Sequence, residues 1–225
     1  MLLHIPDVLS KPEVQSLRRS LDEAGWVSGL ATAGPQAARA KDNEQLSPDT
    51  PAFLPLSERV AAALQRHPLF ISAVLPRHVL PPMFNRYQGG GQYGNHIDNA
   101  LQTDRRSGQV VRTDVSTTVF LSEPEEYEGG ELIVEDSYGT HEVKLAAGDA
   151  IVYPSTSLHR VEPVRSGARI ASFLWTQSLV RDAWRRAMLF ELDMTIVKLR
   201  GQLGDNAEVT ALTGHYHKLL QQWAE

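Results

Sequence analysis

The sequence contains no cysteine among its 225 residues. This absence excludes disulfide bonds and thiolate metal ligands, and it is compatible with a reducing compartment. An excess of basic residues is also missing, because 22 Lys and Arg stand against 27 Asp and Glu and leave a net charge of -5. A balance of that sign argues against a nucleic-acid-binding surface, so we expect no nucleic acid among the partners.

Long apolar runs are missing as well. No run reaches the roughly 18 residues that a membrane span requires. The first residues, MLLHIPDVLSKPEV, lack the basic segment and apolar stretch of a signal peptide. We therefore expect a cytoplasmic protein that does not bind a membrane. With 42% hydrophobic and 22% charged residues, the composition is that of a globular protein with a sizeable core.

The first 68 residues indicate helices. A capping box at Ser10 and Glu13 starts the first helix, and apolar residues recur after it at helical spacing. We place the cap of a second short helix at Ser57, and we interpret residues 30–50 as a loop because they are small and polar. Residues 1–68 are thus expected to form an N-terminal helical region that packs on the core.

Between residues 69 and 178 the hydrophobic pattern alternates, and turn residues separate short segments. The alternating segments are 80–87, 113–122, 130–135, 140–145, 150–154 and 168–177. Short strands without helices between them predict an antiparallel sandwich or barrel. After this domain the helical period returns and predicts a helical hairpin over residues 179–225, which packs on the β domain or joins copies of the chain into a homo-oligomer. The expected fold class is mainly β with flanking helices (α+β).

Two metal-binding side chains stand two residues apart, at His96 and Asp98. Residues i and i+2 of a strand share a face, so the imidazole and the carboxylate would point the same way. His159, which follows an apolar strand, is the best third ligand. Two imidazoles and one carboxylate form the facial triad of non-heme Fe(II) oxygenases, which leaves coordination positions open. Zinc accepts the same donors, so ligand type alone does not select the metal.

Arg169 follows His159 by ten residues and begins an alternating strand. The alternation puts it on one face with Ala171, Phe173 and Trp175. An arginine on an inward, otherwise apolar face is costly unless an anion pairs with it. A small dicarboxylate would do so, because the guanidinium fork matches a carboxylate bidentately. A salt bridge to one of the many glutamates is the alternative interpretation.

The glycines of QGGGQYGNHIDN, residues 88–99, permit either a phosphate-binding loop or a turn. No Gly-Lys-Ser/Thr sequence follows them and no helix begins where they stop, so no helix N-terminus would face an anion. We interpret them as a turn between the strand that carries Tyr87 and the strand that carries His96. Glycine suits this place because it adopts positive φ without strain.

These motifs together resemble the Fe(II)/2-oxoglutarate-dependent dioxygenases of the prolyl-hydroxylase type, and above all the bacterial PKHD-type hydroxylases. The shared order is His-x-Asp, about sixty residues, His, ten residues and Arg. Further segments that resemble the family are FNRYQ at 84–88, YGNHID at 93–98, FLS at 120–122, GGEL at 129–132, AGD at 147–149, YPS at 153–155 and RAMLFELD at 186–193. The resemblance covers essentially the whole chain.

The resemblance implies a double-stranded β-helix (jelly roll) over residues 69–178, with iron at one open end. It implies that His96, Asp98 and His159 bind Fe(II), that Arg169 binds the distal carboxylate of 2-oxoglutarate, and that Tyr87 contacts the same cosubstrate. No catalytic residue is expected beyond this metal centre. The implied reaction hydroxylates an unidentified small-molecule or peptidyl substrate and releases succinate and CO2, with L-ascorbate keeping the iron reduced. A link to bacterial iron uptake or iron homeostasis is implied as well.

A non-catalytic, cupin-like sensor that binds a metal or a ligand is the alternative hypothesis. Arg169 separates the two in part, because a bare metal sensor needs no carboxylate-binding residue opposite its triad. The remaining histidines offer no second site. His215 and His217, for example, lie two residues apart in a predicted helix and would point to nearly opposite faces.

Overall fold

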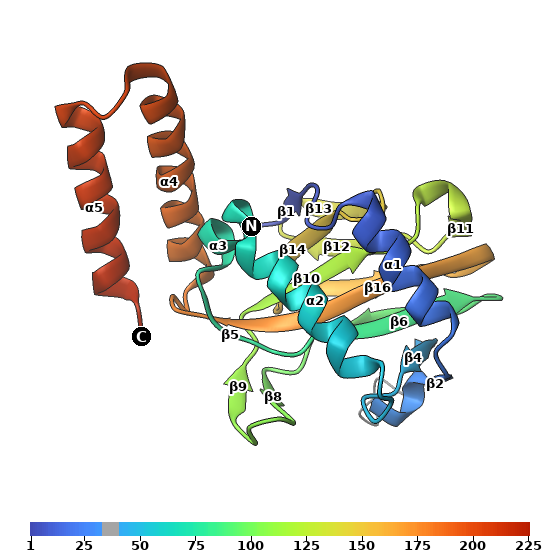
Figure 1. Ribbon diagram of the computed structural model, residues 1–225. Coiled ribbons are helices and arrows are strands. Elements are labelled where there is room, and N and C mark those ends of the chain that lie inside the picture. The colour runs from blue at the N-terminus through green and yellow to red at the C-terminus, as the bar shows by residue number, and fades with distance from the viewer. Residues whose placement is uncertain (33–40) are drawn as a thin grey trace.

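Two antiparallel sheets face each other in the computed structural model, which describes residues 1–32 and 41–225 (Figure 1). The larger sheet has the order β1 (Leu3–Ile5), β14 (Ala150–Pro154), β10 (Val115–Phe120), β16 (Val164–Ser178), β6 (Met83–Gln88), β4 (Glu44–Leu46) and β2 (Trp26–Ser28), and β5 (Pro76–Val79) and β11 (Tyr127–Gly129) also pair with β16. The smaller sheet has the order β13 (Gly139–Val143), β12 (Leu132–Asp136), β15 (Leu158–Val161), β7 (Gln92–His96) and β3 (Lys41–Asp42). A separate hairpin joins β8 (Leu101–Thr103) to β9 (Val110–Arg112).

Helices cover the outer face of the larger sheet. They are α1 (Lys11–Asp22), α2 (Phe53–Arg66) and α3 (Pro68–Val74), while α4 (Ala183–Leu203) and α5 (Ala207–Trp223) form a hairpin that projects from the body (Figure 1). Short 3-10 helices occupy Gly29–Thr32 and Pro124–Glu126. None of the helices in the described ranges is both long and apolar enough to cross a lipid bilayer.

The strand β16 connects the helical layer to the cavity between the sheets. Its alternate residues Ile170 and Leu174 face the helices and join the same apolar core as Leu17 of α1, which is fully buried. Burying one such side chain contributes roughly 1.5–3 kcal/mol. Residues of the opposite face, including Arg169 and Phe173, line the cavity between the sheets. One strand therefore anchors the helices with one face and builds the cavity with the other.

Several sequence predictions are confirmed here. The antiparallel jelly roll, the strands at its centre and the C-terminal helical hairpin are all present. The capping box also forms, since the Ser10 N–H donates to the Glu13 carboxylate at 2.8 Å. As domain boundaries, the ranges 1–68, 69–178 and 179–225 stay a prediction.

The cap predicted at Ser57 is wrong. The helix α2 begins at Phe53, and Ser57 lies inside it, buried to 2% exposure. Pro55 does not prevent this earlier start, because the first four N–H groups of a helix have no acceptor within the helix.

The loop predicted for residues 30–50 is also wrong in part. Residues 41–42 and 44–46 form β3 and β4, which pair with β7 and β6 respectively. Strands of two and three residues are too short to show alternation, so their partners determine them rather than their own pattern. Residues 33–40 of the predicted loop lie outside the described residues.

Candidate metal centre

The glycine turn connects the two sheets of the jelly roll. Gly89 and Gly90 adopt φ values of 59° and 92°, between the end of β6 in the larger sheet and the start of β7 in the smaller one. The Gly91 N–H donates to the Gln88 carbonyl at 2.9 Å and closes the turn. The predicted turn is confirmed, and it carries the chain from one wall of the cavity to the other.

The three predicted metal-binding side chains meet at one point. His96 at the end of β7 pairs in register with His159 on β15, and Asp98 follows two residues after His96. His96 Nε2 lies 4.0 Å from Asp98 Oδ1, and His159 Nε2 lies 3.8 Å from Asp98 Oδ2. One donor atom from each residue lies within 4.8 Å of the other two. Two imidazoles and a carboxylate thus face one small space, a donor set that suits Fe(II).

Backbone carbonyls fix the tautomer of both imidazoles. His96 Nδ1 lies 2.8 Å from the Gly94 carbonyl, and His159 Nδ1 lies 3.0 Å from the Ser157 carbonyl. A carbonyl only accepts, so each Nδ1 donates its proton and each Nε2 keeps a lone pair directed toward Asp98. Burial, followed by the neighbouring His159, lowers the pKa of His96 to about 4. The His96 ring is therefore neutral near pH 7, as a metal ligand must be.

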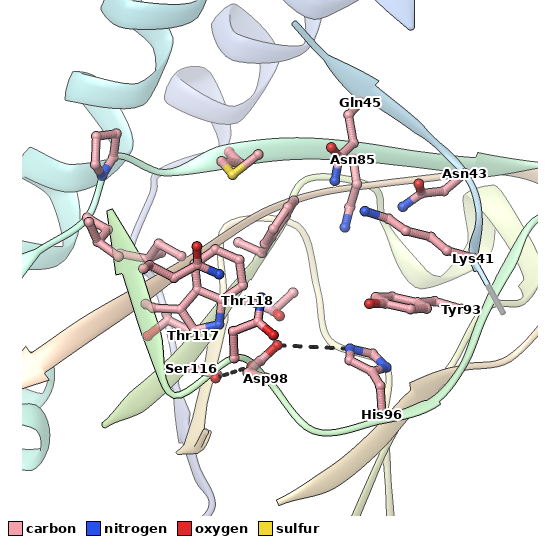
Figure 2. Close-up of a pocket in the computed structure, with 18 of the residues that line it drawn as sticks. Lys41, Asn43, Gln45, Asn85, Tyr93, His96, Asp98, Ser116, Thr117 and Thr118 are labelled. Carbon is pink, nitrogen blue, oxygen red and sulfur yellow. Dashed lines mark hydrogen bonds and ion pairs between the residues drawn. The ribbon is translucent and has the colours of Figure 1, made fainter. Parts of the chain in front are cut away.

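A pair of serines holds the carboxylate. Ser116 Oγ on β10 lies 2.5 Å from Asp98 Oδ2 (Figure 2). It also lies 2.8 Å from Ser155 Oγ, and both serines are 2% exposed. A hydroxyl has one proton, so Ser116, which donates to the Asp98 carboxylate, accepts a hydrogen bond from the Ser155 hydroxyl. Neither serine was predicted to belong to the site. Their weak signals were the inward register of Ser116 and the position of Ser155 in the YPS segment.

Aromatic rings support the histidines from the side. The Tyr93 ring stacks on His96 with centroids 3.6 Å apart and an angle of 18° between planes, and the Tyr153 ring lies 5.1 Å from His159. Burial raises the pKa of Tyr93 to about 12, so this phenol stays neutral. The stacking restricts rotation of the His96 ring in addition to its bond with Gly94.

Arg169 lies on the opposite wall as a buried cation without a counterion. It is 1% exposed, and its Cζ lies 5.5 Å from the centroid of the Tyr87 ring and 5.2 Å from that of Phe120. No carboxylate among the described residues forms an ion pair with it, and its Nε has no hydrogen-bond partner. The alternative of a salt bridge to a glutamate is therefore wrong within the described ranges. By contrast, Arg160 pairs with Glu135 at 2.8 Å.

Tyr87 lies beside Arg169 on the neighbouring strand, in direct register with it. The side chain is 1% exposed, and burial raises the pKa of its phenol. Asn85 Nδ2 donates to Tyr87 Oη at 3.5 Å, which leaves the phenolic proton free to point elsewhere. The phenol can therefore donate to an anion held by Arg169. Contact of Tyr87 with a cosubstrate stays a prediction.

Amide side chains on β4, on β6 and at residue 43 between β3 and β4 form a polar wall that was not predicted. Asn43, Gln45 and Asn85 are only 8%, 2% and 8% exposed, and all three line the cavity (Figure 2). Both polar atoms of Asn43 and Oδ1 of Asn85 lack a hydrogen-bond partner. Lys41 lies nearby, and burial lowers its pKa to about 8. Asn43 and Gln45 lie next to or within short strands that the pattern did not predict, whereas Asn85 lies on the predicted strand 80–87 but carried no signal of its own.

A single cavity of about 1250 Å³ connects the triad, Arg169, Tyr87 and the amide wall. The buried guanidinium and the two imidazoles together fit the metal and dicarboxylate that the sequence predicts. A small cosubstrate can span the cavity from Arg169 toward the triad. The arrangement can therefore hold a metal with open positions next to an anion of defined orientation.

The chain matches two family descriptions in succession. Residues 82–177 match the 2OG-Fe(II) oxygenase superfamily, and residues 183–225 match the PKHD-type hydroxylase C-terminal domain. A PKHD-type hydroxylase of Hyphomonas neptunium is 65% identical over 225 residues, and the alignment covers 100% of both chains. A PKHD-type hydroxylase of Aliarcobacter butzleri is 53% identical over the same span.

Solved structures share the fold at low identity. A prolyl hydroxylase of Trichoplax adhaerens, in complex with a peptide fragment of a hypoxia-inducible factor, has a TM-score of 0.60 at 15% identity, over 83% of this chain and 86% of that one. HygX of Streptomyces hygroscopicus, with nickel and 2-oxoglutarate bound, has a TM-score of 0.55 at 20% identity. The match covers 80% of this chain and 84% of HygX. These likenesses confirm the predicted jelly roll.

Proposed function

The chain belongs to the PKHD-type hydroxylase family of 2-oxoglutarate- and Fe(II)-dependent oxygenases, and from this premise we propose that it hydroxylates a C–H bond of an organic substrate. In the balanced reaction, one atom of O2 enters the substrate as a hydroxyl. The other atom enters succinate as 2-oxoglutarate loses CO2. The observation that carries the proposal is the buried, unpaired Arg169 across the cavity from an open facial triad.

The residues that would hold the iron are His96, Asp98 and His159. When bound, iron and 2-oxoglutarate together supply the activation of O2. The protein supplies the geometry. The carbonyls of Gly94 and Ser157 present both imidazoles through Nε2. The Ser116 hydroxyl donates a hydrogen bond to Asp98 Oδ2, so Oδ1 stays free to bind the metal.

Arg169 and Tyr87 would bind the distal carboxylate of 2-oxoglutarate. A buried charge is costly unless an opposite charge compensates it. The two charges of Fe(II) and that of Arg169 balance the carboxylate of Asp98 and the two carboxylates of the cosubstrate. The loaded centre is therefore neutral, whereas Arg169 alone leaves an uncompensated cation. This balance favours the enzyme over a sensor that binds a metal without a dicarboxylate.

Four further expectations stay predictions of the sequence analysis. They are the use of L-ascorbate to keep the iron reduced, a link to bacterial iron uptake or iron homeostasis, a cytoplasmic location, and homo-oligomers that form through α4 and α5.

Anaerobic addition of Fe(II) and 2-oxoglutarate tests the proposal. We expect the weak visible absorption band of the bidentate iron chelate in the wild-type protein and none in His96→Ala. A wild-type protein that lacks the band would contradict the proposed function.

A further inference from the structure

The cavity extends beyond the triad and Arg169, toward the turn between β8 and β9. Its volume of about 1250 Å³ is larger than the roughly 300–1,000 Å³ typical of pockets that hold a drug-sized ligand. A five-carbon cosubstrate at Arg169 fills only the inner part. The outer part is therefore available to the substrate, and the side chains that line it indicate which kind of substrate can bind.

One wall of the outer part is apolar. Phe173 and Trp175 continue the inward face of β16 beyond Arg169, and their rings meet edge to face with centroids 5.7 Å apart. Leu54 and Ile97 also line the cavity, although they are 45% and 57% exposed. Exposed apolar side chains around a concave surface mark a place that a ligand covers. A substrate with an apolar body would bury them.

The outer part also carries basic side chains. Arg105 and Arg106, in the turn between β8 and β9, both line the cavity. Arg106 lies 3.4 Å from the Asp104 carboxylate, whereas no described carboxylate forms an ion pair with Arg105. Among the described lining residues, Asp49 is the acidic residue other than the triad's Asp98. Asp104 offsets the charge of Arg106, so Arg105 is the cation in this turn without an ion pair to a described carboxylate, and it favours an anionic ligand.

We infer that the substrate is a small organic anion that joins an apolar body to a carboxylate. The body packs against Phe173 and Trp175, and the carboxylate binds at Arg105 and Arg106. The inference rests on the proposed function, because it takes the inner part of the cavity as the place of metal and cosubstrate. Because the loaded centre is neutral, the charge of Arg105 is left for the substrate, while Arg106 is shared with Asp104.

Calorimetric titration of anaerobic enzyme loaded with Fe(II) and saturating 2-oxoglutarate tests the inference. The probes are benzoate, 2-naphthoate and 4-phenylbutyrate, each compared with its own primary amide. We expect at least one of these carboxylates to bind about tenfold more tightly than its amide, because a charge-assisted bond to arginine is lost in the amide. The double variant Arg105→Gln, Arg106→Gln should remove this difference.

Two single variants complete the design. Leu54→Ser should weaken the carboxylate and its amide by the same factor, since it removes apolar contact without changing charge. Arg181→Gln removes an exposed arginine outside the cavity lining and should leave every dissociation constant unchanged. Because Leu54 and the three arginines are solvent-exposed, or half-exposed in the case of Arg106, these variants should fold normally.

The inference and the proposed function fail in different ways. If none of the three carboxylates binds more tightly than its amide, or if the double variant keeps the wild-type preference, the inference is overturned while the anaerobic absorption band still supports the function. If the band itself is missing, the proposed function fails.

Discussion

Replacing Arg169 by leucine should separate cosubstrate binding from folding. In the protein without ligands the guanidinium is 1% exposed and lacks an ion pair to any described carboxylate. Leucine removes this uncompensated charge and keeps part of the apolar volume. The lost contacts with the rings of Tyr87 and Phe120 cost about 2 kcal/mol at this buried site, and this loss opposes the gain from removing the charge. We therefore expect the unfolding free energy of the apoprotein to change by no more than about 1 kcal/mol.

Binding of 2-oxoglutarate should respond much more strongly to the same change. Loss of one partner of a buried, hydrogen-bonded charge pair costs about 2–5 kcal/mol, which corresponds to a rise in the dissociation constant of roughly 30-fold to several thousand-fold. Denaturant unfolding of the apoprotein and anaerobic titration with 2-oxoglutarate measure the two effects, and calorimetric iron titration is the control. An apoprotein destabilised by more than about 2 kcal/mol, or a variant with wild-type cosubstrate affinity, would refute the reasoning.

Three further predictions use other parts of the site and its frame. Tyr87→Phe should raise the KM for 2-oxoglutarate about tenfold, because one hydrogen bond to a charged group is worth about 1.5 kcal/mol. An unchanged KM would show that Tyr87 does not bind the cosubstrate. Ser116→Ala should weaken metal binding about 10–100-fold in a calorimetric titration, and Ser116→Thr should restore most of it; equal affinity in all three proteins would show that Ser116 does not position Asp98. Gly148→Ala should lower the unfolding free energy, measured with denaturant, by more than about 2 kcal/mol, because a Cβ there would lie 2.3 Å from the Leu9 carbonyl oxygen. Gly89→Ala should lower it by only about 1 kcal/mol, because Gly89 has open space around it and only its φ of 59° is unfavourable for alanine.

The parts of the site that could be predicted lie on strands long enough to show a period. Alternation along β16 placed Arg169 on the inward face, and the structure confirms that position in the cavity. The two-residue spacing of His96 and Asp98 and the apolar strand before His159 were equally visible. The glycine turn was recognisable because no helix follows it.

The parts that escaped prediction depend on contacts between distant segments. The amide wall exists because β4 pairs with β6 some forty residues later, and the three-residue β4 carries no pattern of its own. The Ser116–Ser155 pair joins residues 39 apart in the chain, and a serine alone does not reveal its partner. Likewise, the start of α2 depends on a tolerated proline rather than on a polar cap.

Incorporation of oxygen-18 from labelled O2 into succinate tests the central claim most directly, because it requires no knowledge of the substrate. Mass spectrometry should find one labelled oxygen atom in each succinate that the wild-type protein forms from 2-oxoglutarate in the presence of Fe(II). The His96→Ala variant should form no labelled succinate above the level without protein. Wild-type protein that binds Fe(II) but releases no succinate, or releases it without the label, would contradict the assignment of this chain as a 2-oxoglutarate-dependent dioxygenase.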